Sequence, residues 1–129
     1  DAQFLYYRKD LLEKYKRPVP KTWDDMMETA RIIMAGERAP QLQGFSTAGA
    51  PIEGTVCTYL VPLWGAGGDL TRNGKLNLDT PQAREPFQLY GRMKQAGVLP
   101  KPSSVMYSRG SFFSTLATSA RGTWPMVHL

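Results

Sequence analysis

The feature that most restricts how this chain folds is an apolar segment that ends abruptly at consecutive glycines. It covers residues 53–69 and reads EGTVCTYLVPLWGAGGD. Val56, Leu60 and Leu63 are four and three residues apart, a spacing that places them on one face of a helix. Glycine adopts the positive φ that many helix ends require, so the glycine pair predicts where the helix stops. The segment therefore predicts a helix with one buried apolar face.

Several residues of this segment suit a binding surface as well as a core. Pro62 lacks a backbone N–H and should kink the helix. Tyr59 and Trp64 place large rings with polar groups near the kink, and Glu53 puts a carboxylate at the positive end of the helix dipole. Cys57, in the middle of the helix, is expected to be a small core residue. An ordinary core helix and a bent ligand-binding helix both remain open.

Two further helices are predicted from their start signals. Thr22 is a good N-cap, and Asp25 completes a capping-box-like pair with it. The apolar residues that follow keep helical spacing as far as Gly36, the predicted stop. Thr80, followed by a proline, starts a helix that should end at Gly97. The predicted buried face of this helix consists of Ala83, Phe87, Tyr90 and Met93.

Short strands are predicted between the helices. Strands before Asp10, near Phe45 and near Trp124 are expected to share one sheet, and the Asn-Gly pair at 73–74 predicts a hairpin outside that sheet. Residues 111–117 are predicted to form a last helix. The alternation predicts an α/β domain in which helices flank a short-stranded sheet.

Composition argues against several classes of function. The 129 residues suit one domain, and the net charge of +5 is scattered, which favours a solvated surface over a nucleic-acid partner. No apolar run reaches the roughly 18 residues expected of a membrane-spanning helix. Cys57 and His128 are the only cysteine and histidine. They are too few for the usual zinc sites, and no phosphate-binding glycine loop occurs. We expect no metal, no cofactor and no catalysis.

The residues that remain suit carbohydrate binding. Trp64 and Trp124 each lie beside a glycine or a helix-breaking residue, and the C–H face of a sugar ring can stack on an indole. The sugar hydroxyls then need polar partners, because an unpaired buried polar group costs about 1–3 kcal/mol. Asp1 and Glu53 are candidate acceptors. For each tryptophan the alternative is an ordinary core position.

A set of motifs in order along the chain resembles one protein family. DAQFLYYRKDLLEKY followed by PKTWDDM is similar to the stretch that enters the second lobe of extracellular solute-binding proteins of ABC importers. The likeness is greatest to the sugar-binding branch that includes trehalose- and maltose-binding proteins. EGTVCTYL and LWGAGGDL resemble the family's EG-x-VC and LW-x-AGGD, and NGKLNLDTPQA resembles its hairpin and next helix. The Trp-Pro pair at 124–125 resembles the family's Asn-Trp-Pro-Tyr.

The resemblance implies a periplasmic-binding-protein-like architecture, in which a ligand is held between two lobes that close by a hinge. Residues 1–129 would be a single lobe, part of the second, with the first lobe and the C-terminal part outside this sequence. By position, Asp1 would reach a sugar hydroxyl, Trp124 would stack on the sugar, and Glu53 would head a helix pointing at the cleft. Trp64 lies further along that helix. Met126 replaces a family tyrosine, and FFSTLATSARGTW lacks the family's Gly-Lys.

The sequence therefore predicts a non-enzymatic receptor. It would bind a sugar, expected to be a di- or oligosaccharide, and deliver it to the permease of an ABC transporter. It would act in the periplasm or outside the cell and reach the membrane only through the permease or a lipid anchor beyond this sequence. One alternative is a fragment of a carbohydrate-active hydrolase. Another is an interaction domain whose aromatic side chains all lie in the core.

Overall fold

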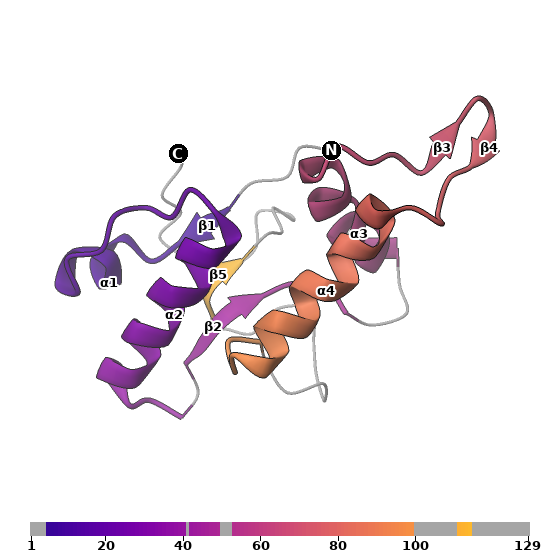
Figure 1. The fold of residues 1–129 in the computed structure, drawn as a ribbon. Coiled ribbons are helices and arrows are strands. Elements are labelled where there is room, and N and C mark those ends of the chain that lie inside the picture. The colour runs from indigo at the N-terminus through magenta and orange to yellow at the C-terminus, as the bar shows by residue number, and fades with distance from the viewer. Residues whose placement is uncertain (1–4, 41, 50–52, 100–110, 115–129) are drawn as a thin grey trace.

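The computed structural model describes residues 5–40, 42–49, 53–99 and 111–114 (Figure 1). Within these ranges helices alternate with short strands, as the sequence predicted. The elements in chain order are β1 (Tyr6–Tyr7), α1 (Lys9–Lys14), α2 (Trp23–Glu37), β2 (Gln43–Ser46), α3 (Glu53–Gly65), β3 (Thr71–Arg72), β4 (Lys75–Leu76), α4 (Pro81–Gln95) and β5 (Ser111–Ser114).

The main sheet has the strand order β1-β5-β2. Its central strand corrects a prediction, because residues 111–117 were expected to be helical and Ser111–Ser114 form β5 instead. β5 runs antiparallel to β1 and parallel to β2, so Phe113 is opposite both Tyr7 and Phe45. Hydrogen bonding to β1 on one edge and to β2 on the other makes this segment a strand, whatever its local preference for a helix. The strand expected near Trp124 lies outside the described residues.

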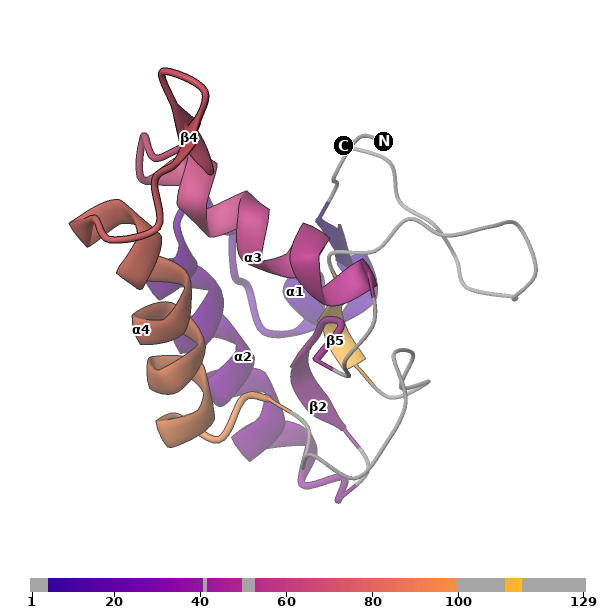
Figure 2. The same cartoon turned by 90° about the vertical axis from the view of Figure 1, so that its right-hand side faces the viewer.

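The hydrophobic core lies between the sheet and the two long helices, α2 and α4, which share one side of the sheet (Figure 2). The rings of Trp23 and Phe45 meet edge to face, with 6.0 Å between their centroids. The buried residues of this core are Leu11, Leu12, Met26, Met27, Ala30, Ile33, Phe45, Leu89, Met93 and Val98.

The predicted start of α2 is confirmed, and its predicted end is wrong. Thr22 Oγ1 accepts a hydrogen bond from the Asp25 N–H at 3.1 Å, and Asp25 Oδ2 accepts one from the Thr22 N–H at 3.2 Å. The helix continues through Gly36 to Glu37. A Cβ at Gly36 would lie 2.3 Å from the ring of Tyr15. The glycine therefore makes room for that ring and does not end the helix.

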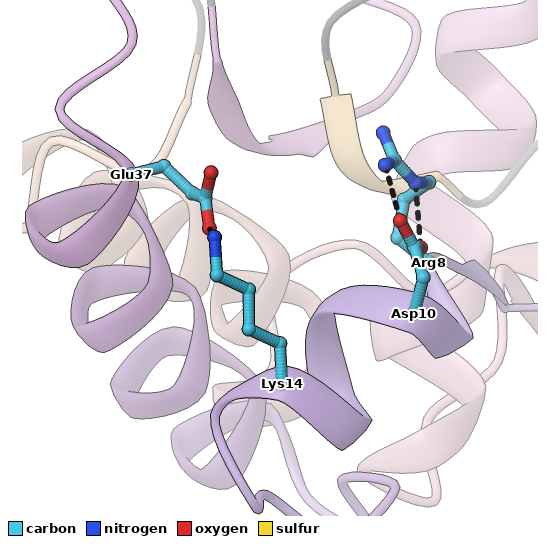
Figure 3. A network of polar contacts seen from close by, with 4 residues as sticks. All are labelled: Arg8, Asp10, Lys14 and Glu37. Atoms are coloured by element: carbon cyan, nitrogen blue, oxygen red, sulfur yellow. Dashed lines mark hydrogen bonds and ion pairs between the residues drawn. The ribbon is translucent and has the colours of Figure 1, made fainter.

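A polar network joins α1 to the end of α2 (Figure 3). Lys14 Nζ donates to Glu37 Oε1 at 2.6 Å. Arg8 is the residue before α1, and its Nε donates to Oδ1 of Asp10 in the first turn at 2.8 Å. The Lys14 interaction spans 23 positions in the sequence, so it fixes the short helix against the long one. All four groups are at least partly exposed, and each pair contributes little alone.

Candidate functional site

Helix α3 is apolar on more than one side, and the rest of the described chain covers only part of it. Thr58, Pro62 and Leu63 are buried, whereas Val56 is 51% exposed and Trp64 is 55% exposed. The predicted face of Val56, Leu60 and Leu63 is thus buried only at Leu63, with Leu60 partly covered. Packing through Thr58 and Pro62 turns Val56 outward.

The uncovered side of α3 forms a continuous surface, which we call the open face and define as Glu53, Val56, Leu60 and Trp64. Glu53 and Trp64 are eleven positions apart, which is about three turns, so both lie on this side and are separated by about 16 Å along the axis. The surface has a carboxylate at its first turn, an indole at its last turn and aliphatic side chains between them. An exposed apolar surface of this kind is typical of an interaction site.

The proline inside α3 is accommodated by a contact from the neighbouring helix α4. Because Pro62 has no N–H, the Thr58 carbonyl lacks its usual donor four residues later. The Tyr90 hydroxyl donates to this oxygen at 2.9 Å. Burial raises the pKa of the Tyr90 phenol, and the Thr47 hydroxyl opposes that shift only in part. The phenol therefore remains a donor at physiological pH.

The Thr58 side chain fixes the same turn of α3. Its hydroxyl donates to the Gly54 carbonyl at 3.1 Å and lies 2.9 Å from the Thr47 hydroxyl. Thr47 follows β2, so this pair connects α3 to the end of a sheet strand. The contacts hold the first half of the open face in place.

A tyrosine hydroxyl of α3 reaches α4 in return. Pro86 lies inside α4 and is buried there. The Tyr59 hydroxyl donates to the Ala83 carbonyl at 2.9 Å, one residue after the carbonyl that Pro86 deprives of its donor. Each helix thus contains a proline and accepts a tyrosine hydroxyl from the other. This exchange ties α3 and α4 together.

The predicted buried face of α4 is wrong at one residue. Phe87 is 72% exposed, and its ring lies against Tyr59 with 5.4 Å between centroids. The face turned to the protein consists of Ala83, Pro86, Leu89 and Met93. The sequence prediction included neither Pro86 nor Leu89 in this face.

The end of α3 is built as predicted. Gly67 has φ 74°, and its N–H donates to the Trp64 carbonyl at 2.9 Å, while the Gly68 N–H donates to the Leu63 carbonyl at 2.9 Å. This is the Schellman arrangement. A Cβ on Gly68 would lie 2.7 Å from Cβ of Gln82, so the turn also brings the chain close to α4.

The predicted site residues are described only in part. Glu53 is exposed in the first turn of α3 and Trp64 is exposed in its last, so neither is a core residue. Asp1, Trp124 and Met126 lie outside the described residues. Sequence reasoning missed that Val56 faces outward. The available signal was the apolar character of the segment on all sides, since a helix apolar all round has more than one face to cover.

The described residues hold few features of other kinds of site. Among the described residues, no group of three or more His, Cys, Asp or Glu could hold a metal ion. No helix in those ranges is both long and apolar enough to cross a membrane. A shallow hollow on α2 is lined by Glu28, Arg31, Ile32, Met34, Ala35 and Ala96. It includes no residue of α3 and does not belong to the open face.

Comparison with known proteins identifies similar chains. Residues 1–115 match the family described as bacterial extracellular solute-binding protein. A probable ABC transporter-binding protein from Deinococcus radiodurans is 38% identical over 93 residues, which cover 68% of this chain and 22% of that protein.

Several solved protein structures are also similar to this chain. T. maritima MalE3 with maltose bound matches with a TM-score of 0.76 and 34% identity, covering 88% of this chain and 31% of that one. A cyclic alpha-maltosyl-1,6-maltose binding protein from Arthrobacter globiformis matches at 22% identity, with a TM-score of 0.70 over 87% of this chain and 30% of that one; this match concerns the fold alone. The chain thus spans less than a third of these relatives.

Proposed function

The chain belongs to the bacterial extracellular solute-binding protein family, and from this premise we propose that it is part of a receptor that binds a sugar for an ABC importer. Its α/β fold, with short strands and flanking helices, is the predicted periplasmic-binding-protein-like fold. Membership places it in a non-enzymatic class, as predicted. The observation that carries the sugar proposal is the 34% identity over 88% of this chain to a protein solved with maltose.

The open face of α3 is the described surface best suited to this role. Trp64 offers an exposed indole on which a sugar ring can stack, and Glu53 offers a carboxylate that accepts from hydroxyls. The backbone positions of these two residues are about 16 Å apart along the axis, so a ligand that contacts both side chains has to be longer than one sugar ring. A di- or oligosaccharide lying along α3 is therefore the ligand that we propose.

The remaining ligand contacts would come from residues beyond the described ranges. We propose that Asp1 accepts from a sugar hydroxyl and that Trp124 stacks on a ring, as the family resemblance implies. Residues 1–129 would form part of one lobe, and the rest of the longer protein would close over the open face by a hinge motion. The closed receptor would then dock on the permease, in the periplasm or outside the cell. It would reach the membrane through the permease or a lipid anchor.

Calorimetric titration of the full-length protein with maltose, trehalose and glucose tests the proposal. We expect saturable binding of a disaccharide. Glu53→Gln should weaken that binding about 10- to 100-fold, because a hydrogen bond to a charged group contributes about 1.5–3 kcal/mol. Glu13→Gln, an exposed carboxylate on α1, is the matched control and should bind normally. A folded full-length protein that binds none of the three sugars would contradict the proposal.

The two alternatives have separate tests. A hydrolase would turn over an oligosaccharide, so release of free sugar by the full-length protein would favour it. A domain whose aromatic residues are all core is already at odds with the exposure of Trp64. Trp124 is the other tryptophan proposed to stack on a sugar ring. Trp124→Ala should lower the affinity for sugar and leave the melting temperature nearly unchanged. A large fall in melting temperature would assign Trp124 to the core.

A further inference from the structure

The part of the chain that builds β2 and α3 has no cationic side chain, although the chain as a whole is basic. The net charge is +5 with 16 lysines and arginines, yet no lysine, arginine or histidine occurs between Arg38 and Arg72. The acidic residues in this interval are Glu53, in the first turn of α3, and Asp69, after its end. The open face therefore belongs to an acidic segment of a basic chain.

The Glu53 carboxylate is exposed and is not neutralised by a neighbour. Within the ranges that the structure describes it takes part in no ion pair, whereas exposed carboxylates on α2 do. Asp24 lies 3.2 Å from Arg92, and Glu28 lies 3.4 Å from Arg17. An exposed carboxylate is ionised at neutral pH. Glu53 thus places an unpaired anion at one end of the open face.

The next cations along the chain lie beyond the opposite end of α3. Arg72 and Lys75 belong to the β3–β4 hairpin, which follows α3 and projects from its end (Figures 1 and 2). Glu53 lies about three helical turns away, in the first turn of α3. Charge is therefore distributed unevenly along the open face, with the anion at the Glu53 end and the cations past the Trp64 end.

The chemistry of Glu53 determines which ligand groups it can pair with. An ionised carboxylate accepts hydrogen bonds and donates none. When a second lobe closes over the open face, Glu53 loses water and needs a donor, because a buried unpaired charge is costly. A sugar hydroxyl or an ammonium group supplies that donor. A carboxylate, phosphate or sulfate on the ligand supplies none and adds like-charge repulsion, which strengthens as water is excluded.

We propose that Glu53 makes the receptor select neutral and amino sugars over anionic ones. The inference rests on the proposed function, in which a di- or oligosaccharide lies along α3. Selection acts on the sugar ring nearest Glu53, since the cations of the hairpin lie past the other end of the open face. An acidic group on a ring near Trp64 is therefore tolerated better than the same group near Glu53.

The test is calorimetric titration of the full-length protein with maltose and charged maltose analogues. Two analogues each carry a carboxylate in place of one primary alcohol, one analogue for each ring, and two more carry an amine at the same positions. One carboxylated analogue should bind at least about tenfold more weakly than maltose, because like charges close together in a water-excluded site repel strongly. The analogue with an amine at that position should bind at least as tightly as maltose.

Variants at position 53 assign the effect to the carboxylate. The readout is the ratio of the dissociation constants of the carboxylated analogue and of maltose, so a general loss of sugar affinity cancels. Glu53→Gln should remove most of the discrimination, whereas Glu53→Asp, which keeps the charge, should retain it. Glu13→Gln makes the same change of net charge on α1 and is the matched control, in which the ratio should equal that of the wild type.

The outcomes distinguish this inference from the proposed function. If the wild-type protein binds maltose and both carboxylated analogues equally well, the selection is overturned and the proposed function stands. The same holds if the discrimination persists in Glu53→Gln, which would assign it to another group in the cleft. If none of these sugars binds, the proposed function fails and the selection fails with it.

Discussion

At the residue scale, the contact that supports the candidate site most directly is a side-chain donor to the one carbonyl that Pro62 leaves short of a partner. Pro62 removes the donor for the Thr58 carbonyl, and the Tyr90 hydroxyl replaces it at 2.9 Å. Without this donor a buried carbonyl would lose a hydrogen bond inside the protein, where water cannot easily compensate. The proline in α3 is thus tolerated because a residue 28 positions later completes the helix.

This account predicts the effect of Tyr90→Phe. The ring keeps its packing and only the hydroxyl is lost, so the free energy of unfolding should fall by about 1–3 kcal/mol. Urea denaturation of the full-length protein, followed by circular dichroism, measures this loss. Tyr6→Phe, on a partly buried strand residue, should have a much smaller effect. Equal stability of the two variants would show that the Tyr90 hydroxyl does not compensate for the missing donor at the Thr58 carbonyl.

The glycines at the end of α3 allow a second prediction. A Cβ at Gly68 would lie 2.5 Å from Leu63 Cδ1 and 2.7 Å from Cβ of Gln82. Gly68→Ala should therefore lower the free energy of unfolding by about 1–3 kcal/mol through overpacking. At Gly65, the last residue of α3, a Cβ meets nothing within 4 Å. Gly65→Ala is the matched control and should be neutral or slightly stabilising.

At the element scale, the junction of α1 and α2 should respond to acid. The Lys14 ammonium lowers the pKa of the Glu37 carboxyl, and the Tyr15 hydroxyl lowers it further. A carboxyl whose pKa is lower in the folded than in the unfolded state adds stability above its unfolded value, about 4.3. That stability is lost as pH falls through the lowered folded pKa.

The measurement is denaturant stability of the wild type and Lys14→Gln between pH 6 and pH 3. Lys14→Gln should reduce stability at pH 6, and its difference from the wild type should shrink as Glu37 becomes protonated. Lys9→Gln, which removes the exposed Lys9–Glu13 pair at 3.6 Å, is the control. A difference between Lys14→Gln and wild type that stays constant down to pH 3 would exclude Glu37 as the partner that matters.

The elements also show which parts of the fold the sequence could predict. The caps at Thr22 and Thr80 and the turn at 73–74 were predicted because their chemistry is local. The strand at 111–114 was missed because it is fixed by partners far away in the sequence. The role of Gly36 was missed for the same reason, since the ring that needs its space belongs to another helix.

The candidate site, like the fold, could be predicted from the sequence only where its structure depends on local residues. The position of Glu53 in the first turn of α3 follows from the apolar segment and its glycine stop. Which side of α3 faces outward does not follow from spacing alone. Val56 and Phe87 have neighbours with helical periodicity, and their exposure depends on how α3 and α4 are rotated against each other. That rotation is set by the buried prolines and by the tyrosine hydroxyls donated between the helices.

At the scale of the whole molecule, we propose that the rest of a longer protein covers the open face. The chain covers 31% of the maltose-bound relative, so most of such a receptor lies outside this sequence. An apolar surface with a carboxylate at one end suits a ligand that is enclosed when another lobe closes over it. In our account α3 is one wall of that enclosure.

The most direct test of this account is a crystal structure of the full-length protein grown with maltose. We predict that the sugar lies between two lobes against the open face of α3, with the Glu53 carboxylate within hydrogen-bonding distance of a hydroxyl group. A sugar bound elsewhere, with Val56 and Trp64 still facing solvent in the closed protein, would contradict the account.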